Sequence, residues 1–365
     1  MLTVLVIVTG LLLLITLLPL SYSQHYLIRS CDFVRLQVCY LASAVIIVAL
    51  IGMWQSGLIA YSLVAVAAFV ILVLQAKWIY PYTWFAKKEV LTAPKSSDHS
   101  IRILCANVLM SNRHSEQLIN LVDKYQPDLL ITLESDSWWQ DKLSVLKKNY
   151  PYQVQCPKDN RYGMHVFSKF NILDAQICEL IEDNIPSIHI LFENHQGLKM
   201  QGHFIHPAPP SPTEEDTSRP RDTELILLAK ALKNNKRPTI VAGDLNDVAW
   251  SRSTRLFMEI SDFLDPRKGR GFFNTFHAGY FFMRWPLDHL FHSHGFTVKR
   301  IKRLAKYGSD HFALLTELVH EPANSNQQLD DEMNIQQAVD ELQMDNTSYK
   351  SVPTFDDDIN KAQLK

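Results

Sequence analysis

Three long apolar stretches fill most of the first 80 residues of this chain, at about residues 2–20, 36–53 and 58–78. Each is almost free of charge. At 1.5 Å per residue, a helix of that length crosses a hydrocarbon core about 30 Å thick. We therefore expect residues 1–90 to form a membrane region with three transmembrane helices.

The first stretch has an alternative interpretation as a cleaved signal peptide. No basic residue precedes it, it is longer than a typical signal core, and no small-x-small cleavage pattern follows Pro19. These features favour a retained helix. The short polar turn at residues 54–57 predicts that the second and third stretches form a transmembrane hairpin. Aromatic side chains typical of the headgroup layer flank the stretches, at Trp54, Trp78, Tyr80, Tyr82 and Trp84.

The orientation in the membrane depends on few charges. Basic residues occur in the first loop and after the third stretch, at Arg29, Arg35, Lys77, Lys87, Lys88 and Lys95. Three spans put these two groups on one side, which the positive-inside rule assigns to the cytoplasm. We therefore expect a multi-pass membrane protein, located in the cell membrane or, in a bacterium, in the inner membrane. The side of the membrane on which the soluble domain lies is left open.

The remaining residues divide by composition into a linker at 91–99, a soluble domain at 100–320 and a tail at 321–365. The tail has 10 acidic and 3 basic residues and is rich in Asn and Gln, which predicts a disordered acidic tail. The soluble domain is nearly neutral, with 27 basic and 25 acidic residues, which argues against a long nucleic-acid footprint. The five cysteines include no CxxC pair and indicate neither a zinc site nor a disulfide framework.

Short β-type runs alternate with helical segments in the soluble domain. We expect strands at 101–107, 129–133, 165–168, 188–192, 199–206, 239–242, 287–292 and 311–318. We expect helices at 115–125, 137–148, 222–234 and 253–260.

Acids, amides and histidines follow several of the apolar runs, at Asn107, Glu134, His206, Asp244, Asn246, Asp288 with His289, and Asp310 with His311. A side chain just past a buried strand is held rigidly while its head lies in a cleft. Oxygen-rich sets of Glu, Asp and Asn suit Mg²⁺ or Mn²⁺, whereas zinc prefers more nitrogen or sulfur. Each residue alone has a structural alternative as a turn former or a solvated surface group.

In this order, the motifs resemble the endonuclease/exonuclease/phosphatase superfamily, the DNase I-like phosphoesterases. The matching pieces span residues 101–319 and are the strand ending at Asn107, residues 127–134, His206-Pro207, Gly243-Asp244-Leu245-Asn246, residues 286–289 and Gly308-Ser309-Asp310-His311. The apolar spans and the His-Pro-rich loop at 206–210 are similar to a membrane-attached, bacterial-type branch. The resemblance implies an α/β (α+β) fold, a four-layer sandwich of two mixed β-sheets flanked by helices.

The resemblance also implies roles for the matching residues. The implied metal ligands are Glu134, Asn107 and Asp310. The implied catalytic residues are His311 as general base, Asp288 as its orienting partner, Asp244 and Asn246 for water and phosphate, and His206 for a phosphoryl oxygen or the leaving group. Arg161 and Tyr162 lie slightly before the position where the family often has a Tyr or Arg, which makes them candidates for substrate binding. The neighbouring His289, His203 and His165 are expected to be structural.

The implied activity is that of a metal-dependent phosphoric ester hydrolase acting on a phosphodiester or phosphomonoester with Mg²⁺ or Mn²⁺. Its partners would be a phosphate-ester substrate, either nucleic acid or a lipid head group, and membrane lipids around the N-terminal helices. A nuclease, a lipid phosphodiesterase and a membrane-tethered binding module without catalysis are the open alternatives. A transporter is disfavoured, because the three spans lack an intramembrane acid or base.

Overall fold

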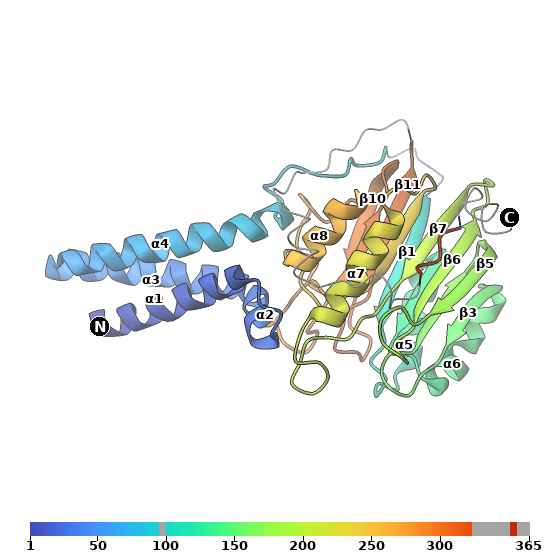
Figure 1. Ribbon diagram of the computed structural model, residues 1–365, viewed down its shortest axis with the longest axis horizontal. Helices are drawn as coiled ribbons and strands as arrows, with labels where there is room; N and C mark the ends of the chain where they lie inside the picture. The colour runs from blue at the N-terminus through green and yellow to red at the C-terminus, as the bar shows by residue number, and fades with distance from the viewer. Residues whose placement is uncertain (95–99, 323–350, 356–365) are drawn as a thin grey trace. The chain divides into compact units, whose positions relative to one another are not determined.

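The computed structural model describes residues 1–94, 100–322 and 351–355, and the chain divides into two compact units (Figure 1). The first unit comprises residues 1–87 and 210–218, and the second comprises the rest of the described chain. Of the expected acidic tail, only residues 321–322 and 351–355 lie within the described residues.

The first unit is helical. It contains α1 (Leu2–Leu17), η1 (Leu18–Ser21), α2 (Tyr26–Phe33), α3 (Arg35–Ser56), α4 (Ile59–Ile79) and η2 (Tyr80–Tyr82). Three helical segments are long and apolar enough to cross a membrane, at Leu2–Ser21, Arg35–Ser56 and Ile59–Tyr82. The predicted hairpin is α3 and α4, and α3 ends at Gly57 in the left-handed conformation (φ 66°).

Small side chains and one polar side chain, that of Gln75, hold the long helices together. Ala42, Ala49 and Ala68 are fully buried between them, and such small residues allow apolar helices to approach closely. Gln75 of α4 accepts a hydrogen bond from Arg35 Nη1 of α3 (2.9 Å) and donates one to Thr16 Oγ1 of α1 (2.9 Å). All three helices therefore share a single chain of hydrogen bonds.

The second unit contains two mixed β-sheets. The first sheet has the strand order β10-β11-β1-β2-β4-β3, and the second has the order β5-β6-β7-β8-β9. The β1–β2 and β7–β8 pairs are parallel and the other neighbours are antiparallel. The strands are β1 (Ser100–Asn107), β2 (Leu129–Leu133), β3 (Tyr152–Cys156), β4 (Met164–Ser168), β5 (Asn171–Cys178), β6 (Ser187–Glu193), β7 (Lys199–Phe204), β8 (Thr239–Asp244), β9 (Asp288–His292), β10 (Phe296–Arg303) and β11 (Leu314–His320).

Alternation along the strands produces a four-layer arrangement. Side chains such as Ile103 of β1 and Phe204 of β7 belong to one apolar cluster between the sheets. On its other face, the first sheet packs against α5 (Ser115–Tyr125) and α6 (Ser137–Leu143), which continues into η3 (Ser144–Lys148). The second sheet packs against α7 (Arg219–Leu232) and α8 (Arg252–Ser261) in the same way (Figure 1). The predicted sandwich of two mixed sheets flanked by helices is confirmed.

Three strands were not predicted, namely β3, β5 and β10, and each lies at the edge of a sheet. Most side chains of β5 are exposed, so it lacks the apolar run by which the other strands were recognised. The predicted strand at 311–318 begins only at Leu314, which leaves His311 in the preceding loop. Residues 351–355 include buried Val352 and Phe355, and Val352 belongs to the apolar cluster around α7 and α8.

Buried neutral histidines are a further feature of this unit. On β6 and β7, His189 Nδ1 lies 2.8 Å from His203 Nδ1, and both rings are fully buried. Burial lowers the pKa of His189 to about 3 and the pKa of His203 well below its usual range. Burial also lowers the pKa of His165 and of His292 to about 4. These four rings are therefore neutral in the folded state at neutral pH.

We predict that the protein loses stability as the pH falls from 7.5 to 5.5. As the pH falls, these histidines take up protons near pH 6.5 in the unfolded chain but only at lower pH in the folded chain. Each histidine therefore lowers the free energy of unfolding by about 1.4 kcal/mol per pH unit below pH 6.5. Glu224 and His311 act in the opposite direction with one proton each, because burial raises the pKa of Glu224 to about 8 and the carboxylates of Asp288 and Asp244 raise the pKa of His311 to about 10. Thermal unfolding in detergent at both pH values measures the net loss. His292→Gln should flatten the profile and the exposed His294→Gln should not; a flat wild-type profile would contradict the prediction.

Candidate active site

The turn after β8 carries two of the predicted residues. A Cβ atom at Gly243 would lie 1.8 Å from the carbonyl oxygen of Ile205, so only glycine lets β8 approach the chain beyond β7 this closely. Asp244 is buried, and its Oδ1 accepts a hydrogen bond from the Asn246 amide nitrogen (3.0 Å). The Asn246 side chain donates from Nδ2 to the carbonyl oxygen of Pro207 (3.0 Å). The side-chain amide of Asn246 therefore holds the loop that carries His206.

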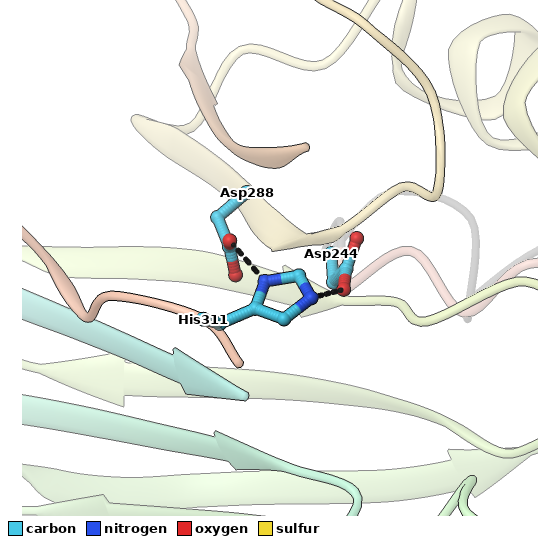
Figure 2. Close-up of side chains that lie close together, drawn as sticks. All are labelled: Asp244, Asp288 and His311. Atoms are coloured by element: carbon cyan, nitrogen blue, oxygen red, sulfur yellow. Dashed lines mark hydrogen bonds and ion pairs between the residues drawn. The ribbon is translucent and has the colours of Figure 1, made fainter. Parts of the chain in front are cut away.

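His311 lies between two carboxylates from the second sheet (Figure 2). Its Nδ1 is 2.8 Å from Oδ2 of Asp288, at the start of β9, and its Nε2 is 3.4 Å from Oδ2 of Asp244, at the end of β8. All three residues are buried, and their ligand atoms lie within 4.8 Å of one another. The geometry is that of a histidine oriented through one nitrogen, with the other nitrogen directed into a polar site.

The charges in this group are strongly coupled. Burial alone would lower the pKa of His311, but the carboxylates of Asp288 and Asp244 outweigh it and raise the pKa to about 10. Burial would raise the pKa of Asp244, but His311 and His206 outweigh it and lower the pKa. Burial raises the pKa of Asp288. The two carboxylates therefore stabilise the imidazolium form of His311.

Asn107 connects this group to Glu134. Its Nδ2 donates to Glu134 Oε1 (2.9 Å) and to Asp244 Oδ2 (3.1 Å). The other oxygen of Glu134 accepts a hydrogen bond from the amide nitrogen of Met110 (3.3 Å). Glu134 has a φ of 58°, an uncommon conformation for this residue type that aims the carboxylate back toward Asn107. A carboxylate after β2 and one after β8 thus meet through a single amide.

The remaining predicted residues are less tightly connected. Asp310 is half-buried, and the Ser309 hydroxyl lies 3.3 Å from its Oδ1. His206 Nε2 lies 4.0 Å from Asp244 Oδ2, and the centroid of its ring is 5.3 Å from that of Tyr162. Arg161 is exposed with a φ of 72°. Among the described residues, direct contacts join eight of the predicted site residues, namely Asn107, Glu134, Tyr162, His206, Asp244, Asn246, Asp288 and His311. Within that part of the chain, the Asp310 side chain is hydrogen-bonded only to its neighbour Ser309, and Arg161 is not brought into the group.

Several supporting residues were missed by the sequence reasoning. Buried Arg267 donates from Nη1 to the carbonyl oxygen of Asp288 (3.2 Å) and lies 2.8 Å from Nδ1 of His289. Asp265 pairs with the same guanidinium at 2.7 Å. The Phe276 ring lies 4.9 Å from the His311 ring. These residues come from a loop of ordinary turn composition, which has no periodic signal. His289 itself is structural, as expected, because it contacts Arg267 and the carbonyl oxygen of Asp247.

The site fits a divalent cation that prefers oxygen. Both sheets contribute side-chain oxygens to it, and carboxylates predominate. Within the described part of the chain, Asp288 Oδ1 and His206 Nδ1 are buried without a hydrogen-bond partner, so each can accept a further contact. Carboxylate and amide oxygens are the ligands that Mg²⁺ and Mn²⁺ prefer, and the absence of cysteine from this set argues against structural zinc.

Comparison with known proteins identifies the fold independently. The sequence model of the Endonuclease/Exonuclease/phosphatase family matches residues 104–311. A family protein from Bacteroides thetaiotaomicron superimposes with a TM-score of 0.50 at 19% identity, over 61% of this chain and 98% of that one. The human Nocturnin catalytic domain, solved with a bound sulfate anion, gives 0.51 at 18%, over 66% and 99%. D. rerio TDP2 with a single-strand DNA product gives 0.50 at 14%, over 61% and 100%. No curated protein sequence matches the chain.

We predict that Gly243→Ala destabilises the second unit by about 3 kcal/mol, because the added methyl group collides with the Ile205 backbone, which cannot move without shifting Asp244. Thermal unfolding of the full chain in detergent measures the loss. Gly10→Ala is the matched control, since an added Cβ there meets no atom within 4 Å. Equal melting temperatures for the two variants would show that the close approach at Gly243 is not required.

Proposed function

Because the chain belongs to the endonuclease/exonuclease/phosphatase family, we propose that it hydrolyses a phosphoester with water, with a divalent cation as cofactor and His311 as general base. The observation that carries the proposal is the position of the His311 ring between the carboxylates of Asp288 and Asp244. The side-chain amide of Asn107 joins Asp244 to Glu134 by hydrogen bonds. This arrangement combines a positioned base with an oxygen-rich cation site, the two elements that hydrolysis of an anionic ester needs.

Glu134, Asn107 and Asp310 are the proposed cation ligands. Glu134 suits this role because its carboxylate is fixed by the hydrogen bonds from Asn107 and Met110 and has no cationic side chain bonded to it among the described residues. A bound Mg²⁺ or Mn²⁺ would neutralise charge on the phosphoryl oxygens and, as a nearby positive charge, lower the pKa of His311 toward neutrality.

His311, which lies in the loop before β11 between two carboxylates of the second sheet, would carry out the proton transfer. Nδ1 of His311 is held by Asp288, so Nε2 is the nitrogen that would take a proton from the attacking water. Both flanking carboxylates stabilise the imidazolium that then forms. Asp244 lies on the Nε2 side and would orient the water. His206, beside Asp244 and Tyr162, would contact a phosphoryl oxygen or the leaving group.

Asn246 has a supporting part in this proposal. Its side-chain amide is bonded to Pro207, so we assign it to holding the His206 loop, and direct contact with phosphate is secondary. Arg161 and Tyr162 remain the proposed substrate contacts, and the ring contact with His206 supports Tyr162.

The proposed setting is a membrane. Three helices long enough to span it support a multi-pass protein of the membrane-attached branch, with the side of the catalytic unit left open. Nucleic acids and lipid head groups are both phosphate esters, and a catalytically inactive binding module is the non-enzymatic alternative. The retained histidine, carboxylates and amide favour an enzyme over that alternative.

We predict that Glu134→Gln and His311→Ala each lower kcat on bis-p-nitrophenyl phosphate by about 10²- to 10⁴-fold. Glu134→Gln should also weaken Mn²⁺ binding in calorimetric titration, whereas His311→Ala should retain it. The exposed His294→Ala is the control for both measurements. Activity without a divalent metal, or full activity in both variants, would rule out the mechanism; a wild type that binds no Mn²⁺ would favour the inactive binding module.

We predict that Asp288→Asn shifts the acidic limb of the pH–kcat profile to lower pH and lowers the maximal rate. The carboxylate of Asp288 raises the pKa of His311, so its removal lets the ring lose its proton at lower pH, and the resulting base is weaker. The profile is measured with saturating Mn²⁺. Asp262→Asn is the matched control, because this aspartate pairs with the exposed His294. A limb that stays in place would exclude His311 as the titrating base.

A further inference from the structure

An aromatic hairpin at residues 275–285 stands beside the candidate site. Its two arms are joined by backbone hydrogen bonds from Phe276 N to Trp285 O (3.0 Å) and from His277 N to Met283 O (3.2 Å). The turn between them exposes four consecutive large apolar side chains. Their exposed fractions are 52% for Tyr280, 83% for Phe281, 59% for Phe282 and 41% for Met283.

The exposed side chains form an ordered group at the tip. The Phe282 ring lies 5.2 Å from the Phe281 ring and 6.1 Å from the Tyr280 ring. Arg284 Nε donates to the carbonyl oxygen of Tyr280 (2.7 Å), which closes the turn. Single exposed apolar residues are common on soluble proteins, but a run of four at the end of a closed hairpin marks an interaction surface.

The hairpin is hydrogen-bonded to the loop that carries Asp310 and His311. Ala278 N donates to the carbonyl oxygen of Asp310 (2.6 Å), and Phe312 N donates to that of Thr275 (2.8 Å). The Phe276 ring packs on the His311 ring at 4.9 Å. Whatever binds the tip is therefore brought close to the residues proposed for catalysis.

Two arginines lie at the base of the hairpin. The guanidinium carbons of Arg284 and Arg303 lie 5.2 and 4.4 Å from the centroid of the Phe312 ring, next to His311. This order of tip and base matches the layers of a membrane interface, in which phosphates lie above the acyl chains. The apolar tip would contact the acyl chains, and the guanidinium groups at the base would lie at the level of the phosphates.

We propose that the tip of the aromatic hairpin enters the membrane that the N-terminal helices span, and that the site hydrolyses a phosphoester of a lipid head group there. The first half depends on the hairpin alone, and the second half rests on the proposed function. A lipid bilayer is favoured over single-stranded nucleic acid, because base-stacking sites lie in a basic groove, whereas the tip at residues 280–283 has no charged side chain. The basic residues of β10 are partly neutralised, since Lys299 and Arg300 pair with Glu317. A bilayer is favoured over a protein partner, because the chain already carries apolar helices of membrane-spanning length.

The insertion is tested with Phe281→Trp in the full chain, reconstituted into vesicles of phosphatidylcholine and phosphatidylglycerol. The fluorescence added by the new side chain, relative to the wild type, should be quenched when brominated phosphatidylcholine replaces the ordinary lipid. The matched control is Val145→Trp, at an exposed apolar residue of η3 that stands apart from the hairpin in sequence, and its added fluorescence should not be quenched. Equal or absent quenching in both variants would overturn the insertion and leave a protein or nucleic acid as the ligand of the tip.

The substrate class is tested by comparing two substrates in the same vesicles. Phe281→Ser should lower the ratio of phosphatidylglycerol hydrolysis to hydrolysis of the soluble bis-p-nitrophenyl phosphate by about tenfold, because only the lipid requires the tip. Val145→Ser should leave that ratio at its wild-type value. Hydrolysis of the soluble ester without hydrolysis of the lipid would overturn the lipid substrate. A wild type that hydrolyses neither would refute the proposed function, while the quenching result would still decide the insertion.

Discussion

The side chain of Asn107 joins the two sheets by hydrogen bonds at the point where the site forms. It is buried, and its amide nitrogen donates to one carboxylate after β2 and to another at the end of β8. Removal of either acceptor would leave a buried N–H group without a hydrogen bond, which would lower the free energy of unfolding by about 1–3 kcal/mol. Its main-chain oxygen accepts hydrogen bonds from the hydroxyls of Tyr307 and Ser309, so the loop before β11 is fixed to the same residue. Asn107 is thus in contact with Glu134, with Asp244 and with the loop that carries His311.

The charge balance explains why these loops hold together. Asp244 and Asp288 are buried within reach of the same imidazole, and two buried carboxylates are unfavourable unless positive charge or hydrogen-bond donors compensate them. His311 supplies the charge, and Asn107 supplies a donor. Arg267 holds the backbone of Asp288 and is itself neutralised by Asp265. The site is thus a set of buried acids stabilised by nearby positive charge and donors, and Asp244, Asp288 and His311 lie close enough together that they could hold a metal ion.

The sequence predicted what is local and missed what depends on tertiary partners. Asn107 and Asp244 were identified because each ends an apolar strand, and that pattern is complete within a few residues. The edge strand β5 was missed because exposed side chains leave it without such a pattern. Arg267 and Phe276 were missed because their role comes from contacts with residues 288 and 311, which no local pattern encodes. For Asn246 the sequence identified the position, and only the structure showed the bond to Pro207.

Placement of the aromatic hairpin beside the site bears on how an enzyme of the proposed kind would reach a lipid substrate. The ester of a lipid head group lies in a layer that a rigid domain approaches only if part of its own surface is compatible with acyl chains. In this chain, that surface is joined to Asp310 by one backbone hydrogen bond and to His311 by one ring contact, so the apolar tip and the proposed base form one connected piece of structure. Four exposed apolar side chains carry an aggregation risk in water, which burial in a bilayer would remove. A substrate that is itself part of a membrane would account for their position next to the histidine.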